Sequence, residues 1–240
     1  FGGDKDNWTR FAGGLTRDYR VVIPDLPGFG ESTKIMSAHY DIENQVGRLN
    51  MFVEAMKLDK FHLAGNSMGG TIAAVYTVKY PQKIMTLSLL APAGVNSPKK
   101  SEVMKMLERG INPLMIGNRD DFDRLFSLLF VKPPVIPGRF KDILAGQAIA
   151  NRSFNEKVWN ELVASKISLE PFLPQIQAPV LVVWGSRDMI LDVSSVQVFE
   201  KVLKKRQMII MDETGHVPML EKPKETAALL NDFIRKTGSR

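Results

Sequence analysis

The sequence predicts an α/β fold in which helices cover both faces of a mostly parallel sheet and a helical insertion interrupts the alternation. Short β-branched runs alternate with helical segments before residue 95 and again after residue 174, whereas residues 95–174 contain helical patterns and no such run. Alternation favours parallel strands, because a crossover helix joins each strand to the next. We therefore expect an α/β core at residues 1–94 and 175–240 and a helical cap at 95–174.

The first half of the core shows strands and helices in turn. "RVVIP" at 20–24 is a β-branched run that ends at Pro24, as a buried strand entering a turn does. Apolar residues between Ile42 and Met56 recur at helical spacing, with Asp41 as the expected N-cap. Three further elements are predicted: a strand in "KFHLAG" (60–65), a tightly packed helix in "MGGTIAAVYTVKYP" (68–81) and a strand in "KIMTLSLLAPAG" (83–94).

The insertion and the second half of the core follow. Two apolar helix faces occur in the insertion, one made by Phe122, Leu125, Phe126 and Leu129 and the other by Val158, Trp159 and Leu162. We expect these helices to lie on the carboxyl ends of the strands, where ligands bind in open α/β folds. The core resumes with a strand in "APVLVVWGSRD" (178–188), a helix at 193–203, a strand in "QMIIMDE" (207–213) and a closing helix at 223–236.

Composition excludes several classes of protein. A chain of 240 residues with 44% hydrophobic content can bury a sizeable core, and no apolar run is long enough to predict a transmembrane helix. The chain has no cysteine, which excludes disulfides and thiolate nucleophiles, and its 3 histidines lie too far apart to suggest a metal site. The net charge of +6 comes from scattered Lys and Arg, so nucleic acid is not an expected partner.

A serine lies at the junction of a predicted strand and a predicted helix. Gly65-Asn66-Ser67-Met68-Gly69 matches the G-x-S-x-G pattern in the context that a nucleophile elbow requires. We expect Ser67 to adopt a strained backbone conformation, and Gly65 and Gly69 to be required because side chains there would collide with the strand and the helix. The Met68 N–H at the helix start is a candidate oxyanion donor.

A serine hydroxyl needs a base to take its proton. His216 is the candidate, because it lies in the Gly-containing loop "DETGHVPMLEKP" between the last strand and the last helix. His62 falls inside a predicted strand and is expected to point into packing. His39 lies in a polar loop with no pattern around it. By elimination we assign His216 as the base.

The carboxylate that orients the base has two candidates. Asp188 follows the strand "PVLVVWG" and lies at its carboxyl end, whereas Asp192 is expected to cap the next helix. Asp212, at the end of the following strand, is the alternative. The chain order Ser67, Asp188, His216 is the order found in α/β-hydrolases.

Six segments together resemble the α/β-hydrolase superfamily and, within it, the monoacylglycerol lipase and lipase/esterase branch. They are "FGGDKDNW", "VVIPDLPGFGES", "FHLAGNSMGGTIAAVYTVKYP", "LLAPAG", "VWGSRDMILDV" and "ETGHVPMLEKP". The resemblance implies the α/β-hydrolase fold, with the backbone N–H groups of Phe1 and Met68 as the oxyanion hole. The family's opening strands and its His-Gly pair before Phe1 are absent here. We interpret this as truncation of the chain.

The resemblance implies a serine hydrolase that cleaves carboxylic esters of lipid type, most of all monoacylglycerols, through an acyl-enzyme on Ser67. It requires no metal and no organic cofactor. The expected partner is a small lipid ester, with association at a membrane surface. The compartment is left open between cytoplasmic and membrane-associated, the latter through an upstream segment.

Four alternatives stay open. The first two are a general carboxylesterase and a triacylglycerol lipase. The third is a hydrolase of carbon–carbon bonds in ring-cleavage products, which would use basic side chains of the cap to bind a substrate carboxylate. The candidate donors are Arg109, Arg119, Arg124, Arg139 and Arg152. The fourth is a receptor that binds its ligand without turnover.

Overall fold

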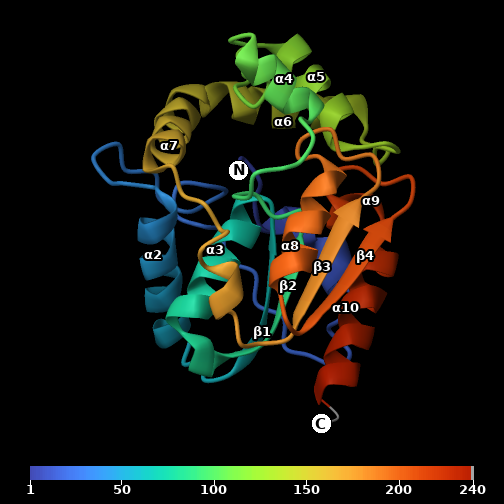
Figure 1. The fold of residues 1–240 in the computed structure, drawn as a ribbon. Helices are drawn as coiled ribbons and strands as arrows, with labels where there is room; N and C mark the ends of the chain where they lie inside the picture. Colours follow the sequence, from blue (N-terminus) through green and yellow to red (C-terminus); the bar gives the residue numbers. More distant parts are fainter. Residues whose placement is uncertain (239–240) are drawn as a thin grey trace.

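The computed structural model describes residues 1–238, in which four strands form one sheet in the order β1-β2-β3-β4 (Figure 1). Each pair of neighbouring strands is parallel: Ala64 lies opposite Ser88 and Val182 opposite Met208. The predicted parallel sheet is therefore confirmed. The strands are β1 (Phe61–Asn66), β2 (Ile84–Leu90), β3 (Val180–Gly185) and β4 (Arg206–Met211).

Helices cover both faces of this sheet, as predicted (Figure 1). The helices of the core are α1 (Thr9–Ala12), α2 (Ile42–Ala55), α3 (Met68–Lys79), α8 (Val196–Val202), α9 (Pro218–Glu221) and α10 (Pro223–Gly238). Val182 and Trp184 of β3 point into a core with α2, α3 and α8, whereas Leu181 and Val183 point into a second core with α1 and α10. Because successive residues of a strand face opposite ways, β3 is buried on both sides.

The ends of these helices follow the sequence signals. The Asp41 carboxylate accepts a hydrogen bond from the N–H of Asn44 at 2.9 Å and caps α2. Helix α3 ends two residues before Pro81, whose ring cannot continue a helix. Within residues 1–238, four short 3-10 helices complete the core and its connections: η1 (Lys5–Trp8), η2 (Pro81–Lys83), η3 (Leu173–Gln175) and η4 (Val193–Ser195).

The prediction of a strand at residues 20–24 is wrong. The segment has no regular secondary structure, and in the described residues β1 pairs with β2 alone. A strand needs a neighbour about 4.8 Å away to complete its ladder. Residues 20–24 and β1 instead both line the same large cavity. The β-branched run therefore indicated a half-buried segment that lines the cavity rather than a paired strand.

The insertion is helical, as its pattern predicts. It contains α4 (Glu102–Glu108), α5 (Arg119–Leu129), α6 (Gly138–Ala150) and α7 (Arg152–Ser165). Figure 1 shows these helices arching over the end of the sheet to which the arrowheads of β3 and β4 point. The exact division into a core and a cap at residues 94 and 175 stays a prediction. Every helix among residues 1–238 is too short or too polar to span a bilayer.

Candidate active site

Ser67 lies in the turn between β1 and α3 with φ 52° and ψ −120°. This positive-φ conformation costs a non-glycine residue on the order of 1–3 kcal/mol. Backbone hydrogen bonds on both sides hold it: the Ser67 N–H donates to Leu90 at 3.0 Å, and the Ser67 carbonyl accepts from the N–H groups of Thr71 and Ala93, each at 3.1 Å. The fold therefore maintains the strained turn that the sequence predicts.

The two glycines of the elbow have different roles. A Cβ atom on Gly65 would lie 2.3 Å from the carbonyl oxygen of Gly69, so only glycine fits there. A Cβ atom on Gly69 would meet no atom within 4 Å, so the predicted collision at Gly69 is wrong. The crowded position of the helix is Gly70, where a Cβ atom would lie 2.8 Å from the side chain of Pro92. Close packing thus begins one residue later than expected.

His216 and Asp188 form a buried pair in the loops that follow β4 and β3. The Nδ1 atom of His216 lies 2.8 Å from Oδ2 of Asp188, and the other carboxylate oxygen accepts the N–H groups of Ile190 and Leu191 at 2.8 and 3.0 Å. A carboxylate accepts hydrogen bonds, so this contact suits an imidazole that donates from Nδ1. In the neutral ring with this orientation, Nε2 is the nitrogen suited to act as a base.

The alternative candidates for the base and for its carboxylate partner make other contacts. Asp212 is exposed and accepts a hydrogen bond from the Ser186 hydroxyl at 3.3 Å. His62 is half-buried, with Nδ1 2.8 Å from the Thr86 hydroxyl, and burial lowers its pKa. His39 is exposed, with Nδ1 3.5 Å from a carboxylate oxygen of Glu161. Among the three histidines, the buried carboxylate partner belongs to His216.

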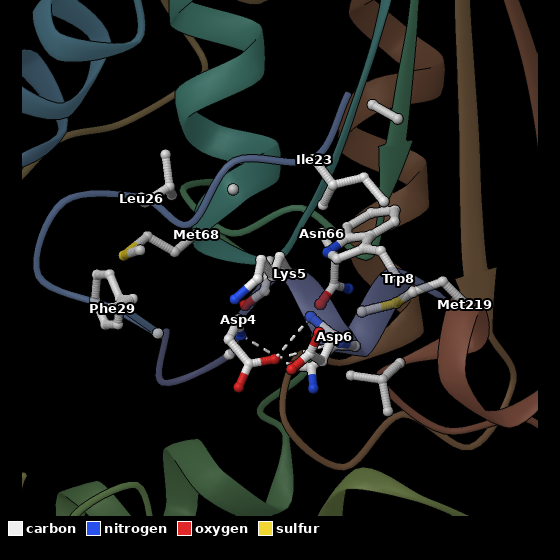
Figure 2. A pocket seen from close by; sticks show the side chains of 18 of the residues that line it. Asp4, Lys5, Asp6, Trp8, Ile23, Leu26, Phe29, Asn66, Met68 and Met219 are labelled. Carbon is white, nitrogen blue, oxygen red and sulfur yellow. Dashed lines mark hydrogen bonds between the residues drawn. The ribbon is translucent and has the colours of Figure 1, made fainter. Parts of the chain in front are cut away.

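A cavity of about 1140 Å³ joins the candidate residues, because Phe1, Ser67, Met68 and His216 all line it. Figure 2 shows Leu26, Phe29 and Met68 on one side of this cavity and Trp8 and Met219 on the other. The Phe1 ring makes edge-on contacts with the rings of Phe29 and Trp159, at centroid distances of 5.7 and 5.9 Å. The predicted oxyanion donors and the serine therefore share one largely apolar space.

A buried carboxylate fixes the loop that begins at Phe1. Asp25 is 6% exposed at its side chain and accepts hydrogen bonds from the N–H groups of Lys5 and Glu31, at 2.7 and 3.0 Å, as well as from the Lys5 ammonium. Burial alone would raise the pKa of the Asp25 carboxyl, but these hydrogen bonds outweigh it and lower the pKa below its usual range. Asp25 therefore holds the loop as an ionised group.

Sequence reasoning missed two residues that hold the histidine loop. The Asn66 amide donates to the carbonyl of Leu90 at 2.9 Å and to the carbonyl of His216 at 3.1 Å, so it joins the serine turn to the histidine. Glu221 accepts the N–H of Gly215 at 2.7 Å. Both lie inside the motifs that mark the site, but only the folded chain shows what their side chains contact.

The comparisons agree with this architecture. The family model for the alpha/beta hydrolase fold matches residues 1–130. Lipase 1 of Psychrobacter immobilis is 38% identical over 95% of this chain and 72% of its own length, and monoacylglycerol lipase abhd6-B of Xenopus laevis is 34% identical over 100% and 74%. The crystal structure of a membrane phospholipase A, described as a bacterial virulence factor, superposes with a TM-score of 0.98 at 45% identity. That match covers 100% of this chain and 77% of the other.

A parallel sheet with a strained serine turn at its carboxyl end, beside a buried histidine–aspartate pair, defines an α/β protein of the hydrolase class. The chain belongs to the α/β-hydrolase fold family and, within it, to the carboxylic ester hydrolases.

Proposed function

We propose that this chain hydrolyses carboxylic esters of lipid type, most of all monoacylglycerols, through an acyl-enzyme on Ser67. The observation that carries the proposal is the convergence on one apolar cavity of the strained Ser67 and the buried, carboxylate-paired His216. The similarity to curated lipases and monoacylglycerol lipases supports the substrate class.

The proposed reaction has two halves. The Ser67 hydroxyl oxygen attacks the ester carbonyl carbon while Nε2 of His216 takes its proton, and the Phe1 and Met68 N–H groups bind the oxyanion. The C–O bond to the alcohol then breaks, and His216 gives its proton to the leaving oxygen. Water then attacks the carbonyl carbon of the acyl-enzyme while His216 takes a proton from it. The bond to the Ser67 oxygen breaks, the acid is released, and His216 returns the proton to Ser67. Asp188 orients the imidazole and stabilises its cation throughout.

The lining of the cavity supports an acyl chain as ligand. The insertion contributes large apolar side chains to it: Leu114, Ile116, Phe122, Phe126, Leu129 and Phe130. Each methylene group that leaves water gains about 0.8 kcal/mol, or about fourfold in binding. Longer acyl chains should therefore react better until the cavity is filled.

An exposed apolar surface supports association with a membrane. Val135, before α6, is 94% exposed, and Phe140, Ile143 and Leu144 of α6 are 61%, 50% and 39% exposed. The nearby Lys132 and Arg139 are also exposed, and cations of this kind favour anionic lipid headgroups. Leu144 also lines the cavity, so this surface reaches the space in which the substrate would bind.

The carbon–carbon hydrolase alternative has less support. The five arginines that it would require (Arg109, Arg119, Arg124, Arg139 and Arg152) are absent from the cavity lining of the described residues. Arg119 pairs with Asp123 and Asp142, Arg124 with Asp121, and Arg152 with Glu156. Two solved structures of a meta-cleavage product hydrolase share the fold at 18% identity, which supports the architecture only.

The substrate proposal predicts a ranking of esters. The measurement is steady-state release of free acid from monoacylglycerols of increasing chain length, a diacylglycerol, a triacylglycerol emulsion and a short water-soluble ester. We expect kcat/KM to be highest for monoacylglycerols of medium or long chain. A preference for the short ester alone would reduce the function to that of a general carboxylesterase, and highest activity on the emulsion would indicate a triacylglycerol lipase. Failure to turn over any ester would favour the carbon–carbon hydrolase or the receptor.

A further inference from the structure

Glu221, the last residue of α9, joins two segments that lie far apart in the sequence. Its half-buried carboxylate accepts the N–H of Gly215, next to His216, through Oε2 at 2.7 Å. Through Oε1 it accepts the N–H of Val131 at 2.9 Å and also that of Lys132, directly after the end of α5. One side chain thus ties the histidine loop to the helical insertion.

The two segments also touch directly. The His216 N–H donates to the carbonyl of Leu129 at 2.9 Å, and a Cβ atom on Gly215 would lie 2.3 Å from that same oxygen. On its other side the His216 carbonyl accepts from the Asn66 amide. The backbone of His216 is therefore held by the serine turn and by the last residue of α5. Glu221 in addition binds the histidine loop and the segment that follows α5.

We propose that Glu221 is a positioning residue that couples the alignment of the His216 imidazole to the position of α5; this inference rests on the proposed role of His216 as the base. A carboxylate suits the task, because all three partners are N–H donors and both of its oxygens accept. Glutamine would turn an NH₂ donor toward one of the two segments and lose the hydrogen bonding there. Hydrogen bonds to a charged acceptor are also stronger than neutral ones.

The coupling has a consequence for substrate binding. Phe122, Phe126 and Leu129 of α5 line the cavity, so a ligand that displaces α5 also displaces the carbonyl to which the His216 N–H donates. Occupancy of the cavity and alignment of the base are then linked through the contact of Leu129 and Glu221 with the histidine loop. Glu221 would adjust the rate of chemistry without touching the substrate.

The substitution Glu221→Gln tests this coupling, with Glu225→Gln as the matched control. Glu225 is an exposed glutamate in the first turn of α10, so the control makes the same change of charge close by. On a short soluble ester we expect Glu221→Gln to lower kcat by about 10- to 100-fold with little change in KM, because small misplacements of a catalytic group carry penalties of this size. The control should match the wild type.

Amide hydrogen exchange distinguishes a role in positioning His216 from a role in stability alone. Glutamine loses the hydrogen bonding to one segment only, but the two segments contact each other through the His216 N–H and the Leu129 carbonyl, so the coupling predicts that both loosen. In Glu221→Gln we therefore expect faster exchange at Gly215 and at Val131 and Lys132 together, while the amides of Ile190 and Leu191, bonded to Asp188, stay as protected as in the wild type. A lower Tm with wild-type kcat at temperatures well below that Tm would overturn the inference, and so would faster exchange on one side alone. If Glu221→Gln does not fold, Glu221→Asp is tested against the same criteria.

A serine-reactive phosphonate separates this inference from the function on which it rests. Labelling of Ser67 in the wild type at a rate that Glu221→Gln leaves unchanged would contradict the positioning role alone. An actively hydrolysing wild type in which Ser67 stays unlabelled would contradict the proposed function itself.

Discussion

Ser67→Ala is expected to lower kcat for ester hydrolysis by about 10⁴-fold or more, because the variant has no oxygen on which an acyl-enzyme can form. The fold should persist, since the backbone hydrogen bonds of Ser67 to Leu90, Thr71 and Ala93 do not involve its hydroxyl. Steady-state hydrolysis of a short soluble ester and a thermal melt measure the two effects separately.

The control for this variant is Ser186→Ala. Ser186 follows β3 at the same edge of the sheet, and its hydroxyl contacts Asp212 rather than the His216–Asp188 pair. We expect nearly wild-type kcat from the control. Normal turnover by Ser67→Ala with an unchanged melting temperature would show that the nucleophile lies elsewhere.

Asp188→Asn is expected to lower kcat by about 10⁴-fold, whereas Asp212→Asn should leave it close to the wild-type value. An amide NH₂ at residue 188 would oppose the Nδ1 proton of His216 and favour the wrong tautomer of the ring. Asp212 is exposed, and its Oδ1 accepts from Ser186, so its loss should not reach the imidazole. Parallel measurements of kcat on one ester compare the two variants.

The reverse ranking of the two variants would transfer the orienting role to Asp212. Equal and small effects would mean that His216 needs no carboxylate or that it is not the base. In either case the 2.8 Å contact of His216 with Asp188 would be a structural feature rather than a catalytic one.

The parts of the fold that the sequence predicts are those set by local pattern. Fully apolar runs such as Val180–Trp184 indicate strands buried on both faces, and both cores of the structure contain alternate residues of that run. The serine turn is equally local, because it needs a strand, a glycine at residue 65 and a helix start in succession. These features depend little on distant parts of the chain.

The features that the sequence does not predict depend on what lies across the fold. The run at 20–24 has the composition of a strand, but pairing depends on a neighbour that composition does not reveal. Gly69 is predicted to be crowded, yet the crowding falls on Gly70, because Pro92 comes from the segment after β2. Asn66 and Glu221 also find their partners only across the fold.

The measurement that tests the central claim most directly is identification of the covalent intermediate. The protein is mixed rapidly with an activated short-chain ester, quenched in acid within the first turnover and digested. The masses of its peptides are then measured by mass spectrometry. We expect the peptide that contains Ser67 to gain the mass of the acyl group, and this gain to disappear in Ser67→Ala. An acyl group on a different residue, or rapid turnover of the ester by Ser67→Ala, would contradict the account.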